Sequence, residues 1–135
     1  MVILLDTNII LDLALQRQPY FEEAIAVLKL IDKSNIRACV TASSITDIYY
    51  IVKKSKNHNE AIEIIKNIIQ YFEIISVDKE IIVRAIESSM KDFEDAIQSF
   101  AALSEKIDYI VTRNIKDFEN SKVLAISPQE FLLIA

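Results

Sequence analysis

The sequence predicts an α/β protein: a three-layer α/β/α sandwich around a central, mainly parallel sheet of four to five strands. Short apolar runs alternate along the chain with longer segments whose apolar residues recur at helical spacing. The first run, residues 2–5, contains only large aliphatic side chains, as is typical of a strand buried on both faces of a parallel sheet. It stops at Asp6, Thr7 and Asn8, so a carboxylate follows the strand where α/β folds place their chemistry.

Each expected element has a matching boundary signal. The expected strands cover residues 2–5, 37–40, 74–77, 109–112 and 123–126, the last of them at a sheet edge. Amphipathic patterns predict helices over residues 8–16, 19–33, 42–52, 60–72, 79–89, 92–105 and 128–135. We expect Thr7 or Asn8 to cap the first helix. The later helices begin near residues suited to first turns or N-caps: Pro19, Thr41, Asp78, Asp92 and Pro128.

The composition excludes several classes of protein. With 135 residues, 52% of them hydrophobic, the chain suits one domain over residues 1–135. It has no glycine, which excludes the Walker loop and the dinucleotide fingerprint, because both need glycine for close approach to phosphate. Its only cysteine, Cys39, excludes an internal disulfide and a cysteine-based metal site. No apolar run has membrane-spanning length and no signal-peptide pattern is present, so we expect a cytoplasmic protein without membrane association.

The net charge of −5 argues against a broad basic surface for long nucleic acids. It is compatible with a metal-dependent nuclease, whose site needs clustered carboxylates. Arg113 and Lys116 are candidates for holding a short substrate strand. The lysines at positions 53, 54 and 56 are explained at least as well by a solvated helix end.

Several acids are expected to meet at one edge of the sheet. The carboxyl ends of parallel strands lie together, so Asp6 after the first strand and Asn114 after the fourth should be neighbours. Asp47 lies about two turns beyond the second strand, and Asp117 follows Asn114 by one turn. Right-handed crossovers would bring a further helix start, with Asp92 and Asp95 on one face, to the same edge. Taken singly, each has a structural explanation, and for Asp92 an N-cap is equally plausible.

Carboxylates gathered without matching basic residues repel one another unless a cation lies among them. Ligand sets made only of oxygen favour Mg²⁺ or Mn²⁺. Such an ion activates water and stabilises charge on a phosphodiester. His58 is the only histidine and is expected in a polar linker, which makes a Ser-His-Asp triad improbable.

The order of these motifs resembles that of the PIN-domain ribonucleases, and in particular the VapC-like toxins of toxin–antitoxin pairs. Four segments carry the resemblance: residues 4–8 with Asp6, residues 41–50 with Asp47, residues 92–96 with Asp95, and residues 110–118 with Asn114 and Asp117. They extend over nearly the whole chain in the family's order.

The resemblance implies an endoribonuclease that depends on Mg²⁺ or Mn²⁺. It implies that Asp6 and Asp95 contact the metal while Asp47 acts through water. Asn8 and Thr112 would be polar supports, and Asp92 an accessory acid at the rim. It also implies an RNA substrate, a small antitoxin partner and a homodimer.

Two departures from the family pattern leave alternatives open. Asp47 stands where glutamate is usual, and Asn114 stands where a fourth acid is usual, a charge that Asp117 is expected to supply. A catalytically weakened PIN-like domain that binds RNA or protein is therefore the alternative to the enzyme. A phosphatase with Asp6 as an aspartyl nucleophile ranks lower, because Asn8 replaces the second aspartate that such enzymes use.

Overall fold

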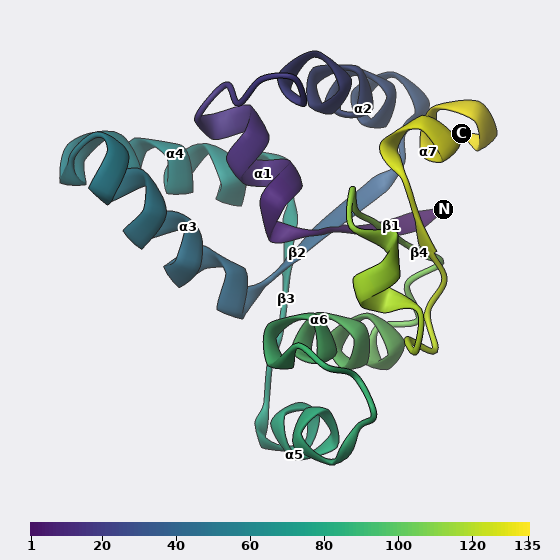
Figure 1. Ribbon diagram of the computed structural model, residues 1–135. Coiled ribbons are helices and arrows are strands. Elements are labelled where there is room, and N and C mark those ends of the chain that lie inside the picture. Colours follow the sequence, from purple (N-terminus) through teal and green to yellow (C-terminus); the bar gives the residue numbers. More distant parts are fainter.

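The computed structural model describes residues 1–135 and has the predicted α/β/α architecture (Figure 1). Five parallel strands form one sheet in the order β3–β2–β1–β4–β5. They are β1 (Val2–Leu5), β2 (Arg37–Thr41), β3 (Glu73–Ile75), β4 (Tyr109–Val111) and β5 (Ala125–Ile126). Because β1 is the central strand, the residue that follows it lies in the middle of the carboxyl edge.

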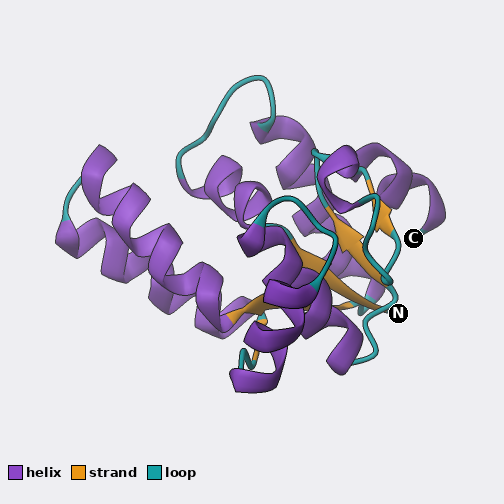
Figure 2. Cartoon of the chain, turned by 60° about the horizontal axis from the view of Figure 1, so that its bottom comes forward, coloured by secondary structure: helices purple, strands orange, loops and turns teal.

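Helices cover both faces of the sheet. One layer holds α1 (Thr7–Ala14), α2 (Phe21–Ser34), α3 (Ala42–Ser55), α4 (His58–Tyr71) and α7 (Pro128–Ile134). The other holds α5 (Lys79–Glu87) and α6 (Phe93–Ser104), with the short 3₁₀ helix η1 (Ile115–Phe118) beside α6. Figure 2 shows the sheet between the two layers and the α3–α4 hairpin extending away from it.

The alternation of side chains along β1 divides the core. Ile3 and Leu5 belong to an apolar cluster with α1–α4 and α7, whereas Leu4 belongs to a second cluster with α5 and α6. All three are buried, with at most 1% of their surface exposed. The strand is therefore apolar on both faces, as the sequence predicts for a parallel sheet.

Several element boundaries differ from the predicted ones. Asp6, rather than Thr7 or Asn8, occupies the N-cap of α1, although its side chain makes no capping bond. The second helix begins at Phe21, after a turn that contains Pro19. His58 is the first residue of α4 and not part of a linker. The third strand is expected at residues 74–77, but β3 begins one residue earlier and ends at Ile75. It ends there because its partner β2 ends at Thr41, opposite Ile75. β5 is likewise shorter than expected, because β4 offers it only two partners, Ile110 and Val111.

The absence of glycine forces ordinary residues into left-handed backbone conformations. Gln16, Asn35 and Lys106 have φ values of 51°, 54° and 55°. Asn35 tolerates this conformation at the end of α2, but Gln16 and Lys106 carry the steric cost of a β-carbon there.

We expect Lys106→Gly to raise the free energy of unfolding by roughly 0.5–1 kcal/mol. Glycine has no β-carbon to clash with the left-handed backbone, and the Lys106 side chain is exposed, so little packing is lost. Glu105→Gly is the matched control: its φ is −92°, so glycine brings only entropy loss and should destabilise. Urea denaturation of both variants measures this. Equal destabilisation by the two substitutions would show that residue 106 carries no strain.

Candidate functional site: an acidic cleft at the carboxyl edge of the sheet

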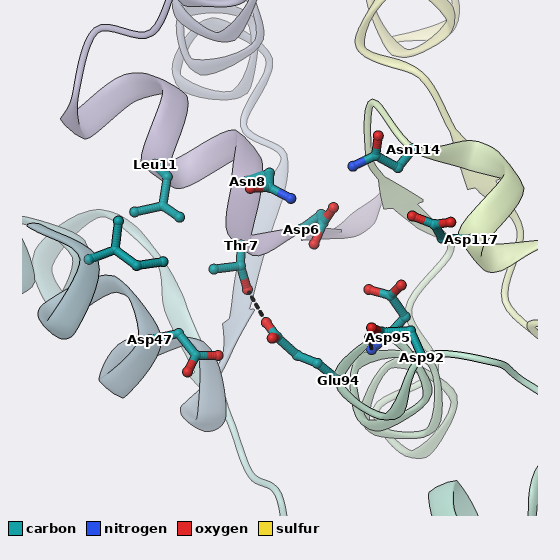
Figure 3. Close-up of a pocket in the computed structure, with 11 residues that line it drawn as sticks. Asp6, Thr7, Asn8, Leu11, Asp47, Asp92, Glu94, Asp95, Asn114 and Asp117 are labelled. Atoms are coloured by element: carbon teal, nitrogen blue, oxygen red, sulfur yellow. Dashed lines mark hydrogen bonds between the residues drawn. The ribbon is translucent and has the colours of Figure 1, made fainter.

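A cleft of about 340 Å³ opens at the carboxyl edge of the sheet. Six of the residues that line it are acids, and none is basic. Figure 3 shows them arriving from β1, α3, α6 and the segment after β4. The lining residues are Asp6, Thr7, Asn8, Leu11, Asp47, Ile51, Asp92, Glu94, Asp95, Asn114 and Asp117. The structure thus brings together most of the residues that the sequence singles out.

Asp6 is the most constrained of these acids. It is only 3% exposed, and its backbone nitrogen continues the β1–β4 ladder by donating to the carbonyl of Val111 at 3.0 Å. The Gln98 amide donates to its Oδ1 at 3.0 Å, and the Thr112 hydroxyl donates to its Oδ2 at 2.8 Å. Burial raises the pKa of Asp6, while these two hydrogen bonds oppose the rise by stabilising the carboxylate. Thr112 therefore supports Asp6 from behind and does not line the cleft.

A chain of hydroxyl groups connects Thr7 of α1, which lines the cleft, with the start of α3. Thr7 lies 2.6 Å from the Ser44 hydroxyl, which lies 2.8 Å from that of Thr41. The Thr7 hydroxyl donates to Glu94 Oε1 at 3.2 Å. Burial and the charge of Asp47 raise the pKa of Glu94 to about 7. Asp47 and Glu94 therefore face each other across this side of the cleft (Figure 3).

The start of α6 supplies two roles at one point. Asp92 is its N-cap and accepts a 2.9 Å hydrogen bond from the backbone nitrogen of Asp95. Asp92 therefore caps the helix, as one of its two explanations requires, and it also lines the cleft. Burial raises the pKa of Asp95 to about 7, and the charges of Asp92, Asp6, Asp117 and Glu94 add to this rise.

The segment after β4 completes the cleft. The Asn114 backbone nitrogen donates to the Thr112 hydroxyl at 3.0 Å, so one threonine organises both Asp6 and this turn. Asp117 lies on η1, one turn after Asn114, and lines the same cleft. In Figure 3 the carboxylates of Asp6, Asp95 and Asp117 face a common space.

The two predicted substrate-binding residues lie elsewhere. Arg113 does not line the cleft: its Nε donates to Asp12 Oδ2 at 2.9 Å, and its guanidinium lies over the Tyr20 ring. Lys116 is exposed and lines an adjoining cavity of about 250 Å³, together with Lys91. That cavity shares Asp92 and Asp117 with the acidic cleft.

The donor set of the cleft suits a hard cation. Six carboxylates line the cleft with no basic residue among them, and the raised pKa values of Glu94 and Asp95 reflect their burial first and the repulsion between these acids second. Oxygen ligands of this kind select Mg²⁺ or Mn²⁺. No three of the acids stand close enough together to hold one ion as they are arranged here. Binding would therefore draw the side chains inward.

Three residues of the site escape the sequence reasoning. Gln98 is fully buried in α6 and would pass for a core position, Thr7 would pass for a helix cap, and Glu94 is hidden beside the more conspicuous Asp95. The available signal for Gln98 is a polar residue between Ile97 and Phe100, three positions after Asp95 and so on the same helix face.

A sequence model of the PIN domain matches residues 2–126 of the chain. The chain belongs to the PIN-domain family. A curated relative, Ribonuclease VapC1 of Aquifex aeolicus, is 25% identical over 134 residues, which are 96% of this chain and 92% of the relative.

Solved structures of this PIN-domain fold are closely similar. VapBC2 from Rickettsia felis, bound to a DNA fragment from its promoter, has a TM-score of 0.73 at 19% identity and covers 94% of this chain and 98% of that chain. VapBC-1 from nontypeable Haemophilus influenzae has a TM-score of 0.72 at 17% identity and covers 96% and 99%. The family model and the relative named Ribonuclease VapC1 bear out the resemblance stated from the sequence, and these structures show the same fold. None of the helices of this PIN domain combines the length and the apolar character needed to cross a bilayer.

The raised pKa of Asp95 has a consequence for stability. A carboxyl group whose pKa is about 7 in the folded state and near 4 when unfolded holds its proton more tightly in the fold. Stability contributed in this way is present at pH 4–5 and is lost as the pH rises towards 7. In the presence of a chelator, we therefore expect the melting temperature to fall between pH 5 and pH 7.5.

Asp95→Asn should flatten this fall, because asparagine has no proton to lose. Asp32→Asn, on the exposed surface of α2, is the control and should keep the wild-type profile. Calorimetry across the pH range measures both. An unchanged profile for Asp95→Asn would mean that neither burial nor the neighbouring acids raise the pKa of Asp95.

Proposed function

We propose that this PIN domain is an endoribonuclease that depends on Mg²⁺ or Mn²⁺ and hydrolyses RNA phosphodiester bonds, and that it is the toxin of a toxin–antitoxin pair. The observation that carries the proposal is the cleft itself, where six acids meet without a basic residue. Membership of the PIN-domain family and the relative named Ribonuclease VapC1 support it.

Asp6 and Asp95 are the proposed direct ligands of the ion, and Asp117 and Asn114 complete the oxygen set from the opposite wall. When bound, such an ion supplies an activated water and neutralises charge that develops on the phosphate. Gln98 and Thr112 stabilise the ionised form of Asp6 against the effect of its burial and fix the orientation of its carboxylate. We assign to Asp47, which faces Glu94 across the cleft, the role of orienting water, and to Asn8 that of supporting the rim.

Asp6→Asn should lower cleavage of a structured RNA in Mn²⁺ by roughly 10²–10³-fold, because the side chain keeps its size but loses its charge. Cleavage is followed by gel electrophoresis of labelled RNA. Asp32→Asn serves as the control for an acid lost outside the cleft. Activity that persists in Asp6→Asn would locate the chemistry elsewhere.

The cavity next to the cleft is the proposed seat for the flanking RNA backbone. Lys91 and Lys116 are both exposed there, and it joins the cleft at Asp92 and Asp117. Phosphates of a strand that enters the acidic cleft from this side would meet the ammonium groups of both lysines.

The double variant Lys91→Gln/Lys116→Gln should raise KM for RNA several-fold with kcat unchanged, and should reduce the salt dependence of binding. The charge-matched control is Lys29→Gln/Lys33→Gln on α2, which should resemble wild type. If both double variants raise KM equally, net charge and not this cavity governs binding.

A catalytically weakened module that binds RNA or protein is the second candidate. Two observations favour it: Asn114 adds no charge, and the acids are spread so that no three of them form a site for one metal ion. Titration calorimetry separates the two functions: the enzyme should bind Mn²⁺ in the micromolar-to-millimolar range, whereas the module should not.

We also propose a small antitoxin protein as the partner, a homodimer as the assembly and the cytoplasm as the location. The support for a partner comes from structural neighbours, among them a toxin–antitoxin complex from Klebsiella pneumoniae that is 23% identical with a TM-score of 0.69 and covers 93% of this chain and 96% of that chain. A short reading frame adjacent to the gene would support the same pairing.

A further inference from the structure

A buried ion pair stands next to the acidic cleft without facing it. Asp12, on α1, has no exposed surface. It accepts hydrogen bonds from Arg113 Nε at 2.9 Å and Nη2 at 3.4 Å, while Arg17 approaches to only 3.8 Å. A carboxylate removed from water in this way needs a partner, and Arg113 is the one that supplies two bonds.

Arg113 is fixed on a second side as well. Its guanidinium carbon lies 3.9 Å from the centroid of the Tyr20 ring, so one face of the cation packs on an aromatic residue while its edge binds Asp12. Only 22% of its side chain is exposed. A phosphate would have to displace both contacts to use this arginine as its ligand.

The position of Arg113 in the chain links this pair to the cleft. Its predecessor, Thr112, donates to Asp6, and its successor, Asn114, lines the cleft. β4 ends at Val111, so residues 112–114 leave the sheet just where the site begins. Arg113 is the side chain of this turn that reaches α1.

We propose that the Asp12–Arg113 pair is a positioning device for the site: by fastening the turn after β4 to α1, it holds Thr112 against Asp6 and Asn114 at the cleft. Arg113 is thereby a positioning residue and not a ligand for RNA phosphate. The kinetic part of this inference rests on the proposed nuclease function, whereas its structural part does not.

The test compares Arg113→Gln and Arg113→Lys with Arg37→Gln. Arg37, the first residue of β2 and so at the opposite edge of the sheet, also makes a two-bond pair, with the exposed Glu73 at 2.8 Å and 2.9 Å. We expect Arg113→Gln to lower kcat by roughly tenfold or more with KM changed by less than about twofold, because the site is displaced and the substrate contacts remain. Arg113→Lys keeps the charge but not the fork and should fall between. Arg37→Gln should match wild type.

Amide NMR of the same proteins gives a readout that is independent of cleavage. Arg113→Gln should shift the resonances of Asp6, Thr112 and the Asn114 side chain, and Arg37→Gln should not. If the wild-type protein does not cleave RNA but Arg113→Gln still shows these shifts, the proposed nuclease function is contradicted while the positioning role is supported.

Two results would overturn the inference. One is a rise in KM at unchanged kcat with weaker salt dependence, which is the behaviour of a phosphate contact. The other is an unshifted Asn114 in Arg113→Gln. Should that variant unfold because Asp12 is left alone, the double variant Asp12→Asn/Arg113→Gln leaves no orphaned charge and takes its place. Wild-type kcat in the folded double variant would equally refute the role.

Discussion

The two hydrogen bonds that Asp6 accepts join three parts of the chain that are far apart in sequence. Gln98 belongs to α6 on one face of the sheet, Thr112 follows β4, and Asp6 itself follows the central strand β1. A buried carboxylate is unfavourable unless donors surround it, so this arrangement requires both the pairing of β1 with β4 and the position of α6 against the sheet. The cleft, the turn at Asn114 and the start of α6 are all located relative to this one side chain.

The carboxylates of the cleft differ in how their negative charge is stabilised. Bonds from two neutral groups, Gln98 and Thr112, limit the rise of the Asp6 pKa, whereas the Glu94 carboxylate accepts one such bond, from Thr7. The pKa values of Glu94 and Asp95 rise to about 7. The adjacent Arg113 does not enter the cleft, because Asp12 binds its guanidinium, and its charge lowers the pKa of Asp6 less than the hydrogen bonds from Gln98 and Thr112 do. The site therefore keeps its negative potential, which is what a divalent cation requires.

The sequence allows the fold class and most of the acidic cleft to be predicted, because both follow from local pattern. An apolar strand that ends in Asp6, and a helix that begins with Asp92 and Asp95, need only the rule that parallel strands end at one edge. The partners of these residues are long-range: Gln98 lies 92 positions from Asp6, and Arg113 lies 101 from Asp12. Helical periodicity predicts only that Gln98 is a core residue, and the charge of Arg113 suggests a ligand for phosphate. Neither pattern reveals the bond that Gln98 makes to Asp6 or the one that Arg113 makes to Asp12.

The most direct test of this account is a crystal structure of the protein soaked in Mn²⁺, with the ion located by anomalous scattering. We expect one peak in the acidic cleft, with oxygens of Asp6 and Asp95 at about 2.1 Å and Asp117 or Asn114 on the opposite side. That result requires the carboxylates to move inward while Gln98 and Thr112 keep their bonds to Asp6. A cleft without a peak at millimolar Mn²⁺, or a peak that leaves Asp6 unbound, would contradict the account.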